Sequence, residues 1–191
     1  MTFSILVVCV GNVCRSPLAE RLLRLRFDQL LGPRGAEVTV ESAGVQALVG
    51  HPMDPPSAAE LVRLGGDADG FVSRQVVDDY LNLADLVLTA TKELRSRVLQ
   101  DVPSALKRTF TLTELAALVD GARADSPGAL LAEAAKRRAS AQPATYDLAD
   151  PIGAPPEVHR EVAAVIDHCT HVIAEAIVAS LTSQAGSVSN P

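Results

Sequence analysis

The 191-residue sequence has no surplus of positive charge. Its 17 lysine and arginine residues are outnumbered by 23 aspartate and glutamate residues, which gives a formal net charge of −6. Proteins that bind nucleic acid or anionic membranes usually present a basic surface, so we expect neither as a partner. The acidic balance opposes an anionic ligand only at long range, because arginine side chains and helix N-termini act locally.

Cysteines and long apolar runs are also few. Three cysteines, an odd number, argue against a disulfide scaffold. The apolar run over residues 5–10 is far shorter than the about 20 residues that span a bilayer, and no basic leader precedes it. We therefore expect a cytoplasmic protein with reduced thiols. A hydrophobic content of 48% suffices for one domain with a sizeable core.

One short segment concentrates the chemistry. It is Cys9-Val10-Gly11-Asn12-Val13-Cys14-Arg15-Ser16-Pro17, here called the phosphate loop. The five residues between Cys9 and Arg15 allow the backbone to curl so that its N–H groups point inward and bind phosphate oxygens. We expect Gly11 to supply a backbone conformation that other residues avoid. The predicted phosphate-binding residues are Val10, Gly11, Asn12, Val13, Cys14, Arg15 and Ser16.

The same segment predicts a nucleophile. Ser16 suits an N-cap and Pro17 suits a first helical position, so the following helix should direct its positive end at the loop. That field and the adjacent Arg15 favour the thiolate of Cys9. The planar donors of Arg15 match two phosphoryl oxygens. We predict phosphoryl transfer to sulfur followed by hydrolysis of the thiophosphate.

A plainer interpretation makes Cys9 a buried core cysteine and Arg15 a solvated helix residue. A kinase-type phosphate loop fits the segment poorly, because no Lys-Ser or Lys-Thr pair follows a second glycine.

At this point the sequence resembles the low-molecular-weight protein tyrosine phosphatase family. The resemblance rests on residues 8–20, on Glu41-Ser42-Ala43-Gly44, on Ser73-Arg74-Gln75 and on Asp150-Pro151. It implies that the cysteine is the nucleophile, the arginine binds phosphate and the aspartate before proline protonates the leaving oxygen. It also implies a phosphotyrosyl protein or small aryl phosphate as substrate, with no cofactor. By analogy with bacterial relatives, a tyrosine kinase is among the expected substrates.

The general acid has two candidates. Expelling a phenolate without a proton is slow, and a placed acid typically contributes about 10²–10⁴-fold. Asp150 is our candidate, because Pro151 stiffens the chain and favours an extended conformation before it. Asp147, three residues earlier, is the competitor.

The sequence departs from the family pattern at the pocket rim. Members often carry aromatic residues after the Asp-Pro pair and after the Ser-Ala-Gly turn, whereas this sequence has Ile152, Gly153 and residues 46–48 there. Because ring stacking contributes about 0.5–1.5 kcal/mol per pair, we expect weakened phosphotyrosine binding. Phe71 also stands near the position of a histidine that supports the loop in some members.

Strand-like and helix-like segments alternate, which predicts a single α/β domain with helices on both faces of a parallel sheet. The family implies four strands in flavodoxin-like order. Expected strands cover residues 3–9, 37–42, 85–91 and 108–112. Expected helices cover 17–31, 54–65, 92–100 and two pieces within 114–143, and a last helix opens at 155–156. The first of these helices should keep Glu20 on its outer face and end at Gly32-Pro33, and the two pieces within 114–143 should be divided by Gly121 and a Ser126-Pro127 cap. The domain should occupy residues 1–181, with a flexible tail over 182–191. The helical insertion over 116–143 is either a substrate or partner selector beside the cleft or a solvated addition.

Two rival functions stay open at this stage. Arsenate reductases share this loop, but they usually have glycine before the arginine and glutamine after the serine, where this sequence has Cys14 and Pro17. A non-catalytic phosphate-binding module would need neither Cys9 nor Asp150.

The other cysteines have plainer interpretations. Cys14 serves either as a redox partner of Cys9 or as a packing residue under the loop. His168 and His171 flank Cys169 without an acidic partner, so we expect no metal.

Overall fold

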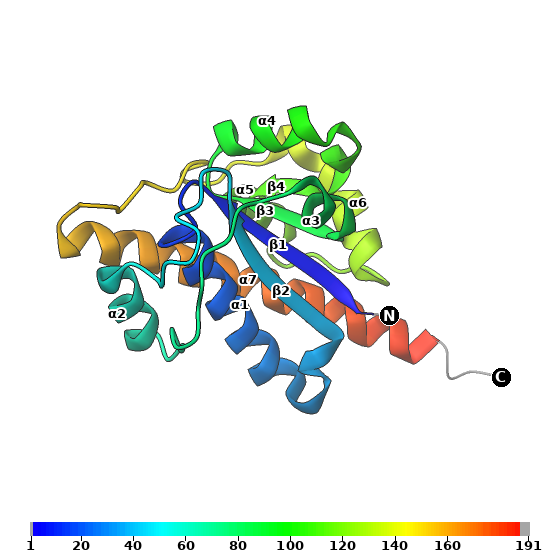
Figure 1. The fold of residues 1–191 in the computed structure, drawn as a ribbon. Helices are drawn as coiled ribbons and strands as arrows, with labels where there is room; N and C mark the ends of the chain where they lie inside the picture. Colours follow the sequence, from blue (N-terminus) through cyan, green and yellow to red (C-terminus); the bar gives the residue numbers. More distant parts are fainter. Residues whose placement is uncertain (1, 188–191) are drawn as a thin grey trace.

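The computed structural model describes residues 2–187 and is built around a four-stranded parallel sheet (Figure 1). The strands are β1 (Phe3–Cys9), β2 (Val38–Gly44), β3 (Leu86–Thr89) and β4 (Thr109–Thr111), in the order β2-β1-β3-β4. This confirms the expected flavodoxin-like order. Strands β3 and β4 are shorter than the sequence predicted.

The central strand β1 positions the phosphate loop. It pairs with β2 on one side and with β3 on the other, and its last residue, Cys9, lies opposite Gly44. Residues 5–9 are fully buried, as expected for a strand covered on both faces. In such sheets ligands bind beyond the carboxyl ends of the strands, where the direction of the connections reverses. The phosphate loop leaves β1 at that point.

Helices cover both faces of the sheet, as predicted. They are α1 (Arg15–Leu31), α2 (Pro55–Arg63), α3 (Asp78–Leu83), α4 (Lys92–Asp101), α5 (Leu112–Val119), α6 (Pro127–Arg137) and α7 (Pro156–Ser187). Right-handed crossovers place α1 on one face and α3 and α4 on the other. Helix α7 packs along α1 and α5 and runs behind the sheet in Figure 1.

Helix α7 is long and apolar enough to cross a membrane by length and composition, but 56% of its most apolar window is buried in the protein. Ile166, Ile173 and Ile177 form its innermost row, so it is a core helix. The helix continues past Thr182, where the sequence predicted a flexible tail. The Thr182 hydroxyl donates to the carbonyl of Val178 one turn earlier, which compensates its polarity inside a helix. Residues 188–191 of that predicted tail lie outside the described residues.

The helical insertion contributes one packed helix. Its helix α6 begins after Ser126, whose side chain accepts the Ala129 N–H as a predicted N-cap should. Leu130, Leu131 and Ala134 are buried where α6 packs on α5, α7 and the 3₁₀ helix η2 (Pro103–Arg108). Helix α6 is therefore a packed element, and none of its residues lines the cavity described below.

Helix α3 was missed by the sequence analysis. Its six residues are too few to show a helical period, and Leu81 is its only buried residue. The signal that was available is the pair Asp78 and Asp79 in its first turn, where acidic side chains favour the helix N-terminus.

Candidate active site

The backbone of the phosphate loop is turned with its carbonyl groups outward. Four of them accept backbone N–H groups of residues 45–54, here called the rim loop: Cys9 from Val45, Val10 from Gln46, Gly11 from Leu48 and Val13 from Asp54, at 2.9–3.1 Å. Within the described part of the chain, the N–H groups of Val10, Gly11, Val13 and Cys14 bind no other backbone or side-chain group. Inward N–H groups without protein partners are what an anion-binding nest requires.

The unusual backbone conformation of the loop belongs to Asn12 and not to Gly11. Asn12 has φ of 53°, which is uncommon outside glycine, whereas φ of Gly11 is not positive. The prediction for Gly11 was therefore wrong. Three groups hold Asn12 in place: its Nδ2 donates to Ser16 and Ser42 at 2.9 and 2.8 Å, and its Oδ1 accepts the Arg74 N–H at 2.8 Å.

The last residue of the Ser-Ala-Gly turn, Gly44, lies against the phosphate loop at the end of β2. A Cβ at this position would overlap the carbonyl oxygen of Val10 and press on the backbone of Asn12. The strand end can therefore lie against the phosphate loop only because residue 44 lacks a side chain.

The sulfur of Cys9 has two hydrogen-bonding neighbours. It lies 2.9 Å from the Ser16 hydroxyl and 3.2 Å from the Asn12 N–H, and Cys9 is only 2% exposed. Ser16 Oγ already accepts a hydrogen bond from Asn12, so its own proton is available to the sulfur. Both neighbours can thus donate to a thiolate.

Ser16 does not cap helix α1. The helix begins at Arg15, and its N-cap is Cys14, whose side chain makes no capping hydrogen bond. Pro17 is consequently the third helical residue. The predicted cap was wrong because the hydroxyl of Ser16 is engaged with Cys9 and Asn12 instead.

A buried carboxylate supports the phosphate loop through Ser42. The amphipathic pattern placed Glu20 on the outer face of α1, but Glu20 is buried and its Oε2 accepts the Ser42 hydroxyl at 2.6 Å. Ser42 in turn accepts from Asn12. Phe71, which cannot make such a bond, lies buried under the Arg21 guanidinium. The chain Asn12, Ser42, Glu20 therefore fixes the direction of the Asn12 amide.

The structure brings Arg15 and Asp150 together across 135 residues. Arg15 Nη2 lies 2.6 Å from Asp150 Oδ2, and Nη1 donates to the carbonyl of Leu148 at 3.1 Å. Arg15 is buried, whereas the Asp150 side chain is 47% exposed. Among the residues that the structure describes, the buried Nε of Arg15 has no hydrogen-bond partner. An unpaired guanidinium N–H beside a nest of backbone N–H groups suits a phosphoryl oxygen.

The competitor Asp147 lies elsewhere. Its carboxylate accepts the backbone N–H of Lys92 at 2.7 Å, at the first residue of α4. Of the two aspartates, only Asp150 is in contact with Arg15.

A cavity of about 610 Å³ adjoins Arg15 and Asp150. Its other lining residues come from the loops and from one face of α4: Val10, Val45, Gln46, Thr91, Glu93, Leu94, Ser96, Arg97 and Gln100. No aromatic residue belongs to this lining, and the rim residues Leu48 and Ile152 are aliphatic and about half exposed. No other part of this lining therefore supplies the aromatic side chains that are absent after the Asp-Pro pair and the Ser-Ala-Gly turn.

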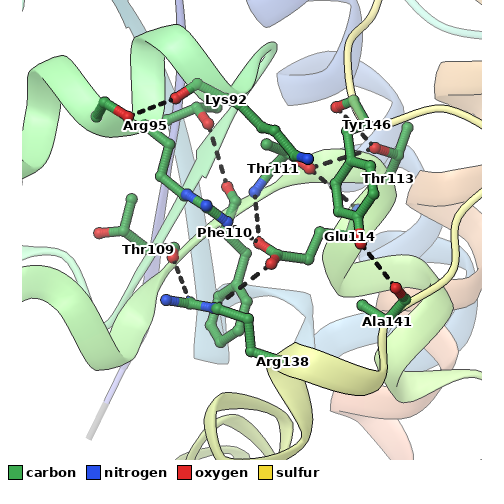
Figure 2. A network of polar contacts seen from close by, with 12 residues as sticks. Lys92, Arg95, Thr109, Phe110, Thr111, Thr113, Glu114, Arg138, Ala141 and Tyr146 are labelled. Carbon is green, nitrogen blue, oxygen red and sulfur yellow. Dashed lines mark hydrogen bonds and ion pairs between the residues drawn. The ribbon is translucent and has the colours of Figure 1, made fainter.

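A polar network that the sequence analysis missed holds α4 from behind (Figure 2). Glu114 is 2% exposed and lies 2.7 Å from Arg95 of α4 and 3.5 Å from Arg138, which follows α6. Thr111 and Glu114 form a capping box at the start of α5. The Thr-x-x-Glu spacing was readable in the sequence, but its link to Arg95 and Arg138 depends on tertiary packing.

The three cysteines differ in their surroundings. All are free and buried. Burial raises the pKa of Cys14 to about 12 and the pKa of Cys169 to about 11. A nearby hydroxyl, Ser57, opposes the shift at Cys14 and also lies 3.1 Å from Nδ1 of the buried His159.

Alkylation should therefore be selective. Neutral pH lies far below the raised pKa values of Cys14 and Cys169, so both thiols stay protonated. Alkylating reagents react readily only with thiolates. We expect iodoacetate to label Cys9 first and inorganic phosphate to slow that labelling. Peptide mass spectrometry measures the modified residue, with the urea-unfolded protein as the control in which all three cysteines react. Rapid labelling of Cys14 in the folded protein would contradict this expectation.

Comparison with known proteins adds independent findings. The family model described as low molecular weight phosphotyrosine protein phosphatase matches residues 4–127, which include the phosphate loop and end before Asp150. The chain is 34% identical over 109 residues to the low molecular weight protein-tyrosine-phosphatase Ptp of Acinetobacter johnsonii, covering 57% of this chain and 71% of the relative. It is 38% identical over 107 residues to the phosphatase Etp of Escherichia coli K12, covering 56% and 67%.

Solved structures agree with these sequence matches over nearly the whole chain. The arginine phosphatase YwlE from Geobacillus stearothermophilus is 28% identical with a TM-score of 0.70, covering 99% of both chains. The tyrosine phosphatase amsI from Erwinia amylovora is 25% identical with a TM-score of 0.69, covering 93% of this chain and 94% of that one.

Proposed function

The chain belongs to the low molecular weight phosphotyrosine protein phosphatase family, and from this premise we propose that it hydrolyses phosphotyrosine or related aryl phosphomonoesters through a phosphocysteine intermediate on Cys9. The observation that supports the proposal is the contact of Asp150 with Arg15, which joins the far end of the chain to the phosphate loop that begins at Cys9. The carbonyl groups of that loop are bound by the rim loop, and several of its N–H groups have no protein partner among the described residues.

The proposed first step transfers the phosphoryl group to sulfur. The thiolate of Cys9, accepting from Ser16 and Asn12, attacks phosphorus in line with the leaving oxygen. The N–H groups of the loop and Arg15 stabilise the charge on the equatorial oxygens. As the P–O bond breaks, Asp150 gives its proton to the leaving phenolate.

The proposed second step regenerates the enzyme. A water molecule attacks the phosphocysteine, the P–S bond breaks, and the sulfur leaves as the thiolate. The Asp150 carboxylate accepts the proton of that water and is ready as an acid again. Inorganic phosphate leaves.

Substrate binding requires an exchange at Arg15. In the free protein Arg15 Nη2 is paired with Asp150, while Nε is unpaired among the described residues. A phosphate dianion that binds Nε and Nη2 together displaces Asp150 from the guanidinium. This displacement moves Asp150 from Arg15 toward the leaving oxygen.

A second candidate substrate is phosphoarginine. It is favoured by the likeness to an arginine phosphatase over 99% of this chain and by the lining of the cavity, in which Glu93 is present and aromatic residues are not. A guanidinium leaving group would gain from a nearby carboxylate, whereas a tyrosyl ring would gain from stacking partners.

Steady-state hydrolysis of p-nitrophenyl phosphate, a phosphotyrosyl peptide and a phosphoarginyl peptide tests the proposal. We expect phosphate release from the aryl phosphates, with a KM for the phosphotyrosyl peptide in the upper part of the usual range, roughly hundreds of micromolar, because no ring stacks on the substrate. A low-micromolar KM would refute weak binding. Higher kcat/KM on the phosphoarginyl peptide would select the second candidate.

The rival functions are separated by the same preparation. Thiol-dependent conversion of arsenate to arsenite without phosphatase activity would show an arsenate reductase. Phosphate binding without turnover of any substrate would show a binding module. We further propose a cytoplasmic location, on the ground of three free thiols, and a tyrosine kinase as one protein substrate.

A further inference from the structure

We propose that Asp147 is a positioning residue: its carboxylate, bound to the N-terminus of α4, holds residues 145–151, here called the acid loop, so that Asp150 meets the leaving oxygen. This inference rests on the proposed role of Asp150 as the general acid. Asp147 itself does not touch Arg15 and transfers no proton in the proposal.

The acid loop has no regular secondary structure of its own to hold it. Two contacts of the Leu148 backbone hold it: the N–H donates to the carbonyl of Ala90, directly after β3, at 2.9 Å, and the carbonyl accepts Arg15 Nη1 of α1. Asp147 adds a third contact, to the N–H of Lys92. Ala90 and Lys92 flank Thr91, so the loop is fastened at the junction of β3 and α4.

Two side chains cap the N-terminus of α4, one adjacent in sequence and one distant. Thr91 is the N-cap and its hydroxyl accepts the Leu94 N–H. The first helical N–H, that of Lys92, is beyond the reach of this cap and is taken by Asp147, 55 residues later in the chain. A carboxylate at this position also lies favourably in the field of the helix. Capping and loop attachment are therefore the same contact.

Lys92 also contacts Tyr146, the residue before Asp147. Its Nζ lies 3.6 Å from the centre of the Tyr146 ring, and Thr113 donates to the Tyr146 carbonyl (Figure 2). Network residues Arg95 and Glu114 fix α4 against α5. The acid loop is thus attached to a helix that is itself immobilised on the side away from the cavity.

The consequence for the reaction is specific. Three residues span at most about 10 Å of chain, so a shift at Asp147 is carried to Asp150, and misplacing a reacting group by about 1 Å can cost up to 10²-fold. The phosphate loop is supported by the rim loop, Ser42 and Glu20, none of which contacts Asp147. Loss of the cap should slow protonation of the leaving group, whereas phosphate binding should lose at most the support that the Leu148 carbonyl gives to Arg15 Nη1.

The test uses two aryl phosphates that differ in their need for an acid. Phenyl phosphate expels a basic phenolate, whereas the nitro groups of 2,4-dinitrophenyl phosphate stabilise its leaving oxygen. For Asp147→Ala we expect kcat/KM on phenyl phosphate to fall about tenfold and that on the dinitrophenyl ester less than about twofold. The inhibition constant of inorganic phosphate should change by less than about twofold. Asp147→Asn keeps an acceptor oxygen and should recover most of the phenyl phosphate activity.

The donor side of the contact supplies a matched pair. Lys92→Pro removes the N–H at a first helical position, where proline is well tolerated, and Thr91 before it is already extended, with φ −145° and ψ 161°. Lys92→Ala removes the same side chain but keeps the N–H. We expect Lys92→Pro to lower kcat/KM on phenyl phosphate selectively, and by more than Lys92→Ala does. In the double variant with Asp147→Ala, Lys92→Pro should cause no further loss of kcat/KM, because both changes remove the same contact.

The outcomes separate this inference from the proposed function. Equal losses on both esters, or no loss, in Asp147→Ala and Lys92→Pro would overturn it. Should Asp147→Ala fail to fold, Lys92→Pro against Lys92→Ala decides alone. If Asp147→Asn is as impaired as Asp147→Ala, the carboxyl and not its acceptor oxygen matters, which also overturns the inference. Asp150→Asn measured in parallel tests the acid itself: a selective loss there without one at Asp147 refutes only the positioning role.

Discussion

Replacement of Cys9 by serine should abolish turnover, with kcat reduced by at least about 10⁴-fold on every phosphate ester. A serine hydroxyl at this position needs a base to become a nucleophile, and the neighbours of residue 9 offer none. Ser16 and the Asn12 N–H are donors, which stabilise an existing anion but accept no proton from a hydroxyl. Phosphate release from p-nitrophenyl phosphate measures the loss.

The backbone nest does not depend on the sulfur, so Cys9→Ser should still bind inorganic phosphate, measured by calorimetry. Cys169→Ala is the matched control, because it also removes a buried thiol but lies on α7 away from the loop. It should retain turnover. Activity of Cys9→Ser within tenfold of the parent would show that the sulfur is not the nucleophile.

Asp150→Ala should lower kcat/KM on phenyl phosphate by about 10²–10⁴-fold, because the leaving phenolate loses its proton source. The same change should leave phosphate affinity unchanged or increase it. Asp150 occupies Arg15 Nη2 in the free protein, and its removal frees that donor for a phosphoryl oxygen. Inhibition constants for inorganic phosphate, measured beside the rates, separate these two effects.

Asp147 provides the decisive comparison for this assignment. If Asp147→Ala and Asp147→Asn both lose turnover by this margin while Asp150→Ala does not, the acid is Asp147 and the assignment of Asp150 is wrong. The two aspartates differ in their contacts in the structure: Asp150 contacts Arg15, whereas Asp147 contacts the N-terminus of α4.

Much of the fold was readable because the informative patterns are local. The uninterrupted apolar run of β1, the Gly-Pro end of α1 and the Ser126 cap of α6 each reflect the conformational preference of a few adjacent residues. Family resemblance supplied the strand order, which periodicity does not determine. Helix α3 escaped because six residues carry almost no periodic signal.

The errors at the site have a common cause. Ser16 resembles an N-cap by its sequence position, and Glu20 resembles a solvated residue by its helical phase. Each instead has a hydrogen-bond partner that lies elsewhere in the fold, the sulfur of Cys9 for one and the hydroxyl of Ser42 for the other. The left-handed conformation at Asn12 is likewise held by Ser42 and Arg74, which are distant in sequence.

The sequence by itself predicted the proposed reactive groups, because Cys9 and Arg15 lie within one short segment between a strand and a helix. Only the tertiary structure decided which aspartate contacts Arg15, that α6 packs on α5 and α7, and that Glu20 supports the phosphate loop. The physical reason is that these contacts join segments 22 to 135 residues apart. Their partners become neighbours only when the sheet and its helices are packed.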